Sequence, residues 1–303
     1  MRAGLTPEVS IVIPFLNAER FMREALDSVV AQEHGRWEVL LVNDGSSDGS
    51  EEIAREFVKD NPGRTRYLEH PNGAPRGISA SRNLAVRHAR GRYIAPLDAD
   101  DVWLPGKLRE QTQILEAHGE AGMCVGASEY WHSWSPAAAT RDIVRGAGPS
   151  WRGEVPPPVL LWACLEGRSP SPPPSDILVR RDVVDGVGGF EEVFGGTYQL
   201  YEDQAFLAKV FISTRVFVEG KVWDKYRLHP WSCSAAILSA RGEDTARRFY
   251  LRWLRSYLLL KRVRDRSVWR AVRFALLRYE HPVVYAVHPR RWMRLAWAAM
   301  RTG

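Results

Sequence analysis

Tyr93-Ile94-Ala95-Pro96-Leu97-Asp98-Ala99-Asp100-Asp101 joins a mostly apolar run to three carboxylates within four positions. Like charges so close together repel one another, which raises the pKa of at least one of the groups. A hard divalent cation such as Mg²⁺ or Mn²⁺, held by one or two carboxylates and by phosphate oxygens, relieves this repulsion. In an extended segment Asp98 and Asp100 would share a face. The stretch predicts either a metal–diphosphate site at the edge of a sheet or an acidic turn that caps the next helix.

The sequence before this stretch alternates between strand and helix patterns. Apolar, β-branched runs at residues 9–13 and 37–42 predict buried strands. Helical spacing predicts helices at residues 19–32 and 50–58, the first capped by Asn17. This order is typical of a parallel sheet, in which ligands bind beyond the carboxyl ends of the strands. Because Asp44 and the acidic cluster both follow such ends, we expect them to share one site.

The rest of the chain continues this pattern with one interruption. Further strands are predicted at residues 66–69, 91–97, 123–128, 176–179, 216–218 and 222–228, and further helices at residues 78–89, 105–118, 159–166 and 201–211. Residues 131–175 instead combine tryptophans with Pro156-Pro157-Pro158 and Pro172-Pro173-Pro174, which predicts irregular walls around the short helix. The aromatic side chains there either pack in the core or stack on sugar rings.

The composition is that of a soluble globular protein. The 303 residues are 45% hydrophobic and 26% charged, and three widely spaced cysteines predict neither a disulfide framework nor a metal motif. We therefore expect a reducing cytoplasm, no signal peptide and no apolar run of the ~20 residues that a spanning helix needs. Residues 241–303 hold 16 Lys and Arg against 4 Asp and Glu, whereas the preceding chain is net negative. This asymmetry favours an anionic surface as a partner.

Several polar residues allow two interpretations each. Arg82, on the first turns of the predicted helix at residues 78–89, either reaches a phosphate or is an ordinary surface arginine. Glu202 and Asp203 begin the predicted helix at residues 201–211, where carboxylates either do chemistry or interact with the helix dipole and free N–H groups. His229 is either a ligand or a structural histidine.

Seven separated motifs occur in order within residues 8–235. They are Ser10-Ile11-Val12-Ile13-Pro14-Phe15-Leu16-Asn17, Val42-Asn43-Asp44-Gly45-Ser46-Ser47-Asp48-Gly49, Ser81-Arg82-Asn83, Leu97-Asp98-Ala99-Asp100-Asp101, Gly188-Gly189-Phe190-Glu191, Glu202-Asp203 and Tyr226-Arg227-Leu228-His229-Pro230. Together they resemble family 2 glycosyltransferases, inverting enzymes with the GT-A fold. The resemblance implies an α/β fold with a Rossmann-like mixed sheet flanked by helices. We expect residues 1–240 to form this domain, with a nucleotide-binding half 1–130 and an acceptor-side half 131–240, and residues 241–303 to form a basic amphipathic helical extension.

The resemblance also implies roles for individual residues. Asp203 matches the general base, and Asp100 and His229 match metal-binding positions. Asp98 and Asp100 together match the DxD pair of the family. The positions that match contacts to the nucleotide sugar are Pro14, Phe15, Asn17, Asp44, Asn72, Arg82 and Asp98.

The implied activity is metal-dependent transfer of a glycosyl group, with inversion, from a nucleotide-diphosphate sugar to a saccharide or lipid-linked acceptor in cell-surface polysaccharide synthesis. A UDP-sugar is the expected donor, and Mn²⁺ or Mg²⁺ is the expected cofactor. Two alternatives stay open: a sugar-nucleotidyltransferase, and a carbohydrate-binding pseudoenzyme of the same fold. The first would carry a Gly-rich basic loop after the first strand, where this chain has Pro14-Phe15-Leu16-Asn17-Ala18-Glu19. A dehydrogenase is disfavoured because no GxGxxG motif follows any predicted strand.

The end of the chain has a two-sided pattern. On a helical wheel Arg290, Arg291, Arg294 and Arg301 gather on one side, and Trp292, Met293, Leu295, Trp297 and Met300 lie on the other. A basic stripe beside an apolar face is typical of a helix on an anionic membrane surface, and the alternative is a helix packed on the body. We expect a cytoplasmic enzyme that is peripheral on the inner face of the cell membrane. No nucleic-acid partner is expected, because no binding motif accompanies the charge.

Overall fold

The computed structural model describes residues 6–136, 140–148 and 151–289. Within them, ten strands and eleven α-helices alternate along the chain. The strands are β1 (Val9–Phe15), β2 (Trp37–Asn43), β3 (Thr65–Glu69), β4 (Tyr93–Pro96), β5 (Val102–Trp103), β6 (Ala121–Trp131), β7 (Ile143–Gly146), β8 (Gly153–Val155), β9 (Leu178–Arg180) and β10 (Arg215–Arg227). The helices are α1 (Glu19–Val30), α2 (Ser50–Asp60), α3 (Ile78–His88), α4 (Lys107–Ala117), α5 (Val159–Leu165), α6 (Arg181–Val187), α7 (Glu202–Ser213), α8 (Cys233–Ser239), α9 (Glu243–Leu260), α10 (Arg266–Glu280) and α11 (Pro282–Val287).

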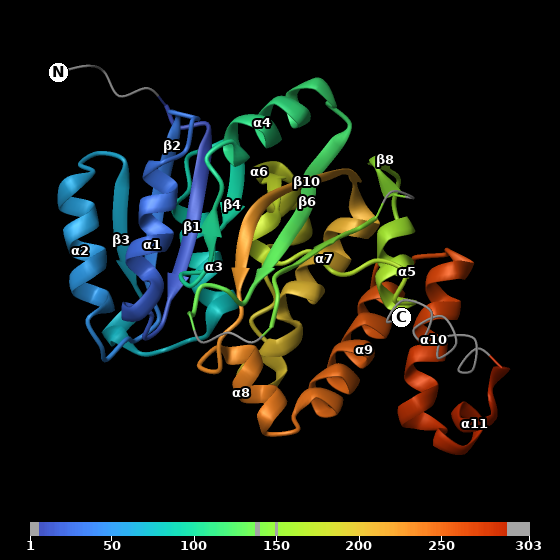
Figure 1. The fold of residues 1–303 in the computed structure, drawn as a ribbon. Coiled ribbons are helices and arrows are strands. Elements are labelled where there is room, and N and C mark those ends of the chain that lie inside the picture. Colours follow the sequence, from blue (N-terminus) through green and yellow to red (C-terminus); the bar gives the residue numbers. More distant parts are fainter. Residues whose placement is uncertain (1–5, 137–139, 149–150, 290–303) are drawn as a thin grey trace.

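The strands form one mixed sheet in the order β3-β2-β1-β4-β9-β6-β10-β5, with β7 beside β6 and β8 beside β10. β1, β2, β3 and β4 pair in parallel, as do β6 and β10. β9 runs antiparallel between β4 and β6 and so joins the two parallel parts. This is the mixed α/β sheet that the resemblance implies, and the carboxyl ends of its parallel strands meet at one edge (Figure 1).

Helices cover both faces of the sheet, because successive side chains of a strand point to opposite faces. On β1, Ile11 and Ile13 belong to the core shared with α1, α2 and α4, whereas Val12 belongs to the core on the other face. That second core includes side chains of α3, α5, α6 and α7. A parallel sheet buried on both faces explains why these strands are continuous apolar runs in the sequence.

The helical extension joins this second core. Leu251 and Leu254 of α9 and Val272 of α10 are buried in it, together with residues of α5 and α7. α9 and α10 therefore pack on the body of the domain. The predicted amphipathic segment at residues 290–303 lies outside the described residues. None of the helices in the described part of the chain has the length and apolarity that crossing a bilayer requires.

Three local predictions are wrong. β1 continues through Pro14 to Phe15. Proline has no backbone N–H to donate, but the pairing of β1 with β4 ends at Val12 and Pro96, so Pro14 leaves no bond to β4 unmade. Asn17 does not cap α1; its Oδ1 accepts the backbone N–H of Ser47 instead. The two closing strands are one strand, β10, which passes through Gly220 with irregular register between Val218 and Val222.

Candidate active site

The acidic stretch after β4 forms a turn in which the backbone N–H of Asp101 donates to the carbonyl of Asp98 at 3.1 Å. It is not the extended segment we expected, so each carboxylate faces a different partner. Asp101 is buried and accepts hydrogen bonds from the Ser175 hydroxyl at 2.6 Å and from the Arg227 backbone at 2.9 Å. The side chains of Asp98 and Asp100 stay 21% and 31% exposed. Asp101 therefore holds the turn together, and the other two carboxylates face the site.

Burial and repulsion set the charge of this turn. Burial raises the pKa of Asp98, against the opposing effect of Arg82, and Asp100 adds to the rise. Burial also raises the pKa of Asp101 well above its usual range, with Asp100 and Asp98 as the next causes. The mutual repulsion that the sequence predicts is present, and a bound cation would reduce it.

Arg82 lies at the centre of the site, fully buried on α3. Its Nη2 is 2.6 Å from Oδ1 of Asp98, and its Nη1 donates to Glu202. Burial by itself would lower the pKa of Arg82, but the carboxylates of Glu202 and Asp98 raise it, so the guanidinium stays charged. The surface-arginine alternative is thus wrong. A buried charge of this kind is tolerated only because two carboxylates compensate it.

Asp203 is the second residue of α7, directly after Glu202. Its Oδ1 accepts the backbone N–H of Gln204 at 2.6 Å, and no described residue donates to its Oδ2. Burial, followed by repulsion from Glu202, raises the pKa of Asp203 to about 7. Glu202 and Asp203 therefore differ in kind: the first neutralises Arg82, and the second is a carboxyl group poised to exchange a proton near neutral pH.

His229, just after β10, reaches back to the acidic turn. Its Nε2 is 2.9 Å from Oδ2 of Asp100, and its Nδ1 is buried without a hydrogen-bond partner among the described residues. The ring of Phe21 lies 4.6 Å from the imidazole and that of Trp231 lies 5.9 Å away. Arg20 stacks on Trp231 at 4.2 Å. The position of His229 is thus fixed by aromatic side chains on α1 and on its own loop.

Asp44 and its neighbours form the other end of the site. Both Asp44 oxygens accept backbone N–H groups at the start of α3, from Arg76 at 2.8 Å and from Gly77 at 2.9 Å. The hydroxyl of Ser81, the residue before Arg82, donates to Asp44 at 3.1 Å. α3 therefore connects Asp44 to the network of Arg82 and Asp98, so the two acidic positions border one edge, as the sequence led us to expect.

The remaining predicted nucleotide contacts lie beside Asp44. Pro14 and Phe15 are buried in β1, where the Phe15 ring packs near Tyr67. Asn17 is exposed in the loop after β1, with its side chain bound to the loop around Ser47. Asn72 is exposed, with a backbone φ of 63°, in the loop that Asp44 holds in place. Their contacts to a nucleotide stay predictions.

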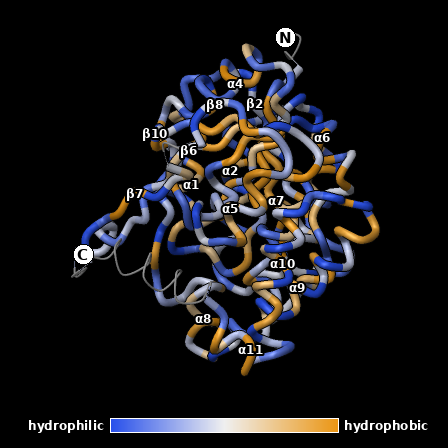
Figure 2. Tube along the Cα trace, turned by 90° about the vertical axis from the view of Figure 1, so that its right-hand side faces the viewer, coloured by the Kyte–Doolittle hydropathy of each residue, from blue (hydrophilic) through white to orange (hydrophobic). Residues whose placement is uncertain are grey.

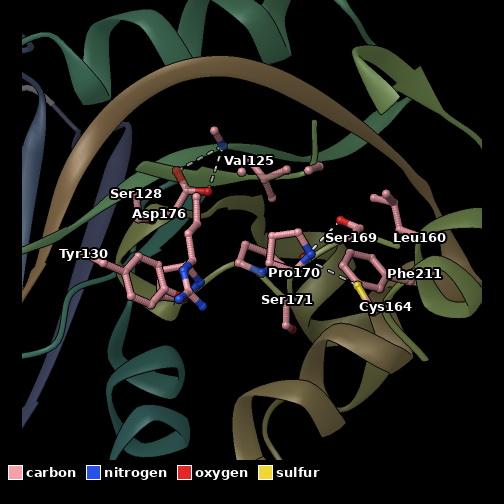
Figure 3. A pocket seen from close by; sticks show the side chains of 16 residues that line it. Val125, Ser128, Tyr130, Leu160, Cys164, Ser169, Pro170, Ser171, Asp176 and Phe211 are labelled. Carbon is pink, nitrogen blue, oxygen red and sulfur yellow. Dashed lines mark hydrogen bonds between the residues drawn. The ribbon is translucent and has the colours of Figure 1, made fainter. Parts of the chain in front are cut away.

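A recess opens on the acceptor-side half, between β6, β7, α5 and the proline-rich segment at residues 169–173. Figure 3 shows Tyr130 at one end of it and Cys164 and Phe211 at the other. Inside, the Asp176 carboxylate accepts the Gly126 backbone N–H at 2.8 Å. Phe211 of α7 also lines the recess, so the recess lies beside that helix. The proline-rich segment at residues 169–173 thus lines a recess, and its role toward an acceptor stays a prediction.

Ser175 is a site residue that the sequence did not indicate. Its hydroxyl donates to Asp101 and accepts the backbone N–H of Asp98 at 3.1 Å. It lies in a short 3₁₀ turn, Pro174–Asp176, whose backbone carbonyls also bind Trp103 and Lys107. A serine after a proline run has no local signal for this role, because the acidic turn lies more than 70 residues away in the chain.

The residues present supply part of the ligand set that a divalent metal of the implied kind needs. In the described part of the chain, no three His, Cys, Asp or Glu side chains gather as a complete metal site. The partly exposed carboxylates of Asp98 and Asp100 and the adjacent imidazole of His229 offer a small set of oxygen and nitrogen donors. Mg²⁺ and Mn²⁺ accept such a set when waters and substrate phosphates supply the other ligands.

Comparisons with known proteins agree with this geometry. A sequence model described as Glycosyl transferase family 2 matches residues 10–186. The chain is 37% identical over 110 residues to TuaG of Bacillus subtilis, named as a teichuronic acid biosynthesis glycosyltransferase, and 34% identical over 112 residues to the B. subtilis glycosyltransferase EpsE. These alignments cover 36% and 37% of this chain, and 42% and 40% of the two relatives, so they span about two fifths of each relative.

Two solved structures show the same fold. One is S. aureus TarS 1–349 in complex with UDP-GlcNAc, with a TM-score of 0.67 and 16% identity over 93% of this chain and 76% of that chain. The other is the mannosyltransferase PcManGT of Pyrobaculum calidifontis in complex with GDP-Man and Mn²⁺, with a TM-score of 0.61 and 19% identity over 98% of this chain and 76% of that chain. At these identities the likeness concerns the fold alone.

Proposed function

The chain belongs to glycosyl transferase family 2, and from this premise we propose that it transfers a glycosyl group from a nucleotide-diphosphate sugar to an acceptor hydroxyl with inversion. The observation that carries the proposal is the Asp203 carboxyl group, whose pKa is raised to about 7, beside the Arg82–Asp98–Glu202 network. The acceptor is a saccharide or a lipid-linked saccharide of cell-surface polysaccharide synthesis. The names of TuaG and EpsE support that setting.

Each part of the site has a task in this reaction. Asp44, Asn17, Asn72 and the end of β1 would bind the base and ribose. Asp100 and His229, with Asp98 beside them, would hold Mn²⁺ or Mg²⁺, which stabilises the charge that develops on the departing diphosphate. Arg82 keeps Asp98 and Glu202 in place through its two ion pairs. The solved complexes with UDP-GlcNAc and with GDP-Man and Mn²⁺ support a nucleotide-sugar donor, and we propose a UDP-sugar.

Asp203 would act as the general base. Its free Oδ2 accepts the proton of the acceptor hydroxyl as the hydroxyl oxygen forms its bond to the anomeric carbon, on the side opposite the departing diphosphate. A carboxylate suits this step because bond breaking runs ahead of attack and the hydroxyl becomes acidic late. A base with a pKa near the working pH is the most effective, since a large fraction of it is deprotonated in the resting enzyme and the carboxylate still accepts a proton well.

The first test is a screen of nucleotide sugars with Mn²⁺, with UDP-GlcNAc and GDP-Man as the first probes. We expect one donor to raise the melting temperature, because a ligand that binds the folded state stabilises it, and to release its nucleoside diphosphate during incubation. Binding without release would support the pseudoenzyme alternative. Inorganic pyrophosphate release from a nucleoside triphosphate and a sugar phosphate would instead support a sugar-nucleotidyltransferase.

A lipid-linked acceptor would bring the enzyme to a membrane surface. The segment with the composition to meet that surface is the basic extension at residues 241–303, with its excess of Lys and Arg. We propose that the protein is cytoplasmic and peripheral on the inner face of the cell membrane.

A further inference from the structure

α11 exposes an apolar surface that the body of the protein does not use. Its three valines, Val283, Val284 and Val287, are 78%, 51% and 73% exposed within a helix of six residues. The helix is held by its other side, where the ring of Tyr285 lies 5.5 Å from that of Phe274 on α10. Grouped exposed apolar side chains of this kind mark a contact surface.

α11, which carries this valine surface, lies at the same end of the molecule as α8. At the end of α10, Arg278 is 3.1 Å from Asp244 on the first turn of α9. Gly242, just before α9, donates its N–H to Ile237 of α8 at 3.0 Å. α8 itself begins near the carboxylates of the candidate site: burial, then Glu202, Asp98 and Asp100, raise the pKa of the Cys233 thiol. Figures 1 and 2 both show α8 and α11 at this lower end of the protein.

The part of the chain that leads to α11 has a large excess of positive charge. Residues 241–289 contain twelve Lys and Arg and four Asp and Glu. Of the twelve, Arg255 and Arg278 form ion pairs with described residues, and the other ten form none within the described part of the chain. The sequence after α11 adds four more arginines. An anionic surface is the partner that matches this charge.

A second apolar group competes for the same role. Leu259 and Leu260, at the end of α9, are 63% and 76% exposed and precede Lys261 and Arg262. By the rise of an α-helix, this leucine pair lies about 25 Å from the first residue of α9. Docking through the leucine pair would hold the active-site edge away from the surface, whereas docking through α11 brings it close.

We propose that α11 docks the protein on an anionic membrane surface, with Val283, Val284 and Val287 entering the headgroup region and the unpaired cations facing anionic lipid. An apolar group that inserts while basic side chains contact the headgroups is the usual arrangement of interfacial helices. The inference rests on the proposed function in one respect: a lipid-linked acceptor would be the reason for this orientation. The docking itself requires neither donor nor metal.

The test is flotation of the full chain with vesicles of equal parts phosphatidylglycerol and phosphatidylcholine, and with phosphatidylcholine alone. One variant carries Val283→Ser, Val284→Ser and Val287→Ser; the matched control carries Leu259→Ser and Leu260→Ser. All five side chains are exposed and no charge changes, so unfolding curves should match that of the wild type. We expect the wild type and the leucine control to float with the anionic vesicles only. The valine variant should lose at least about tenfold in partitioning.

Three results would overturn the proposal. The wild type stays in the dense fraction with anionic vesicles, the valine variant floats as well as the wild type, or the leucine variant alone loses flotation. Light scattering is measured on the same samples. If the wild type is a dimer, the valine variant is a monomer and flotation is unaffected, a second copy of the chain covers the valine surface instead of a membrane. Because vesicle binding is measured without donor, metal or acceptor, its failure is distinct from a failure of the transfer assay.

Discussion

The Nε2 atom of His229 lies 2.9 Å from Oδ2 of Asp100, although 129 residues separate the two in the sequence. The segment before His229 is attached to the same turn, because Arg227 donates from its side chain to the carbonyl of Asp100 at 2.7 Å and from its backbone to Asp101. The end of β10 is thus held on the acidic turn by several bonds. Asp100 and His229 therefore form one unit, whose two members should respond together to substitution.

Asp100→Asn and His229→Gln should each weaken Mn²⁺-dependent binding of the donor by about 10–100-fold, the usual cost of disturbing a metal site. The double variant should lose less than the product of the two single losses, since residues in contact are not additive. Calorimetric titration of the donor identified by the screen, with Mn²⁺ present, measures these losses. His118→Gln is the control, because His118 pairs with Glu154 in a partly exposed position. Strictly multiplicative losses would contradict the pairing of Asp100 with His229.

Arg82→Met should lower the free energy of unfolding by about 3–5 kcal/mol, because it leaves the buried carboxylate of Glu202 and the partly exposed carboxylate of Asp98 without their counter-charge. Arg23→Met is the control: Arg23 also pairs with a carboxylate, Glu56, but both side chains are exposed. Loss of such a surface pair typically costs ~0–1 kcal/mol. Urea unfolding measures both. Equal small losses would show that the Arg82 network does not support the fold.

Ser175→Ala should lower stability by about 1–3 kcal/mol, since it removes a donor from the buried carboxylate of Asp101. It should also weaken donor binding, because the same hydroxyl holds the Asp98 backbone. Ser175→Thr keeps the hydroxyl and should restore most of both properties. Ser256→Ala, which removes an exposed hydroxyl bonded within α9, should change neither. A stable Ser175→Ala variant with normal donor binding would remove Ser175 from the site.

The ionised Asp203 carboxylate should lower the free energy of unfolding at neutral pH, and Asp203→Asn should remove this loss. The folded-state pKa of about 7 lies above the value of 3.8 for an ordinary Asp, so the folded protein holds a proton that the unfolded chain has released. The loss of folding stability caused by Asp203 is absent below about pH 4 and grows as the pH rises from there to about 7. We expect Asp203→Asn to be more stable than the wild type above pH 7 and equally stable near pH 4. Unfolding curves at both pH values measure the difference, and a variant less stable at pH 7.5 would contradict the raised pKa.

Local patterns in the sequence predict much of the first half of the fold. Apolar runs and helical spacing place β1, β2, α1 and α2 to within a few residues, because each element is buried against its neighbours in the chain. The position of β9 between β4 and β6 has no local signal, since antiparallel pairing across the sheet depends on segments far apart. The same holds for β10, whose length depends on β6 beside it.

The site was predictable where residue type alone limits the chemistry. The carboxylates of the acidic cluster and the family resemblance of Asp203 indicated candidates whose roles stay predictions, whereas the role of Ser175 depends on a distant turn. The burial of Arg82 could not be predicted from the sequence either, because an arginine on a helix is usually exposed. Its burial follows from Glu202 and Asp98 arriving on both sides from other parts of the chain.

The most direct test of the central claim, that Asp203 takes the proton from the acceptor, is the turnover number of Asp203→Asn with donor affinity measured on the same preparation. The control is Asp182→Asn, because Asp182 also lies in the first turn of a helix and accepts the N–H of the next residue. We predict a fall in turnover of ~10²–10⁴-fold, the usual effect of losing a general base, with donor affinity unchanged and the control active. Turnover within a few fold of the wild type would contradict the claim.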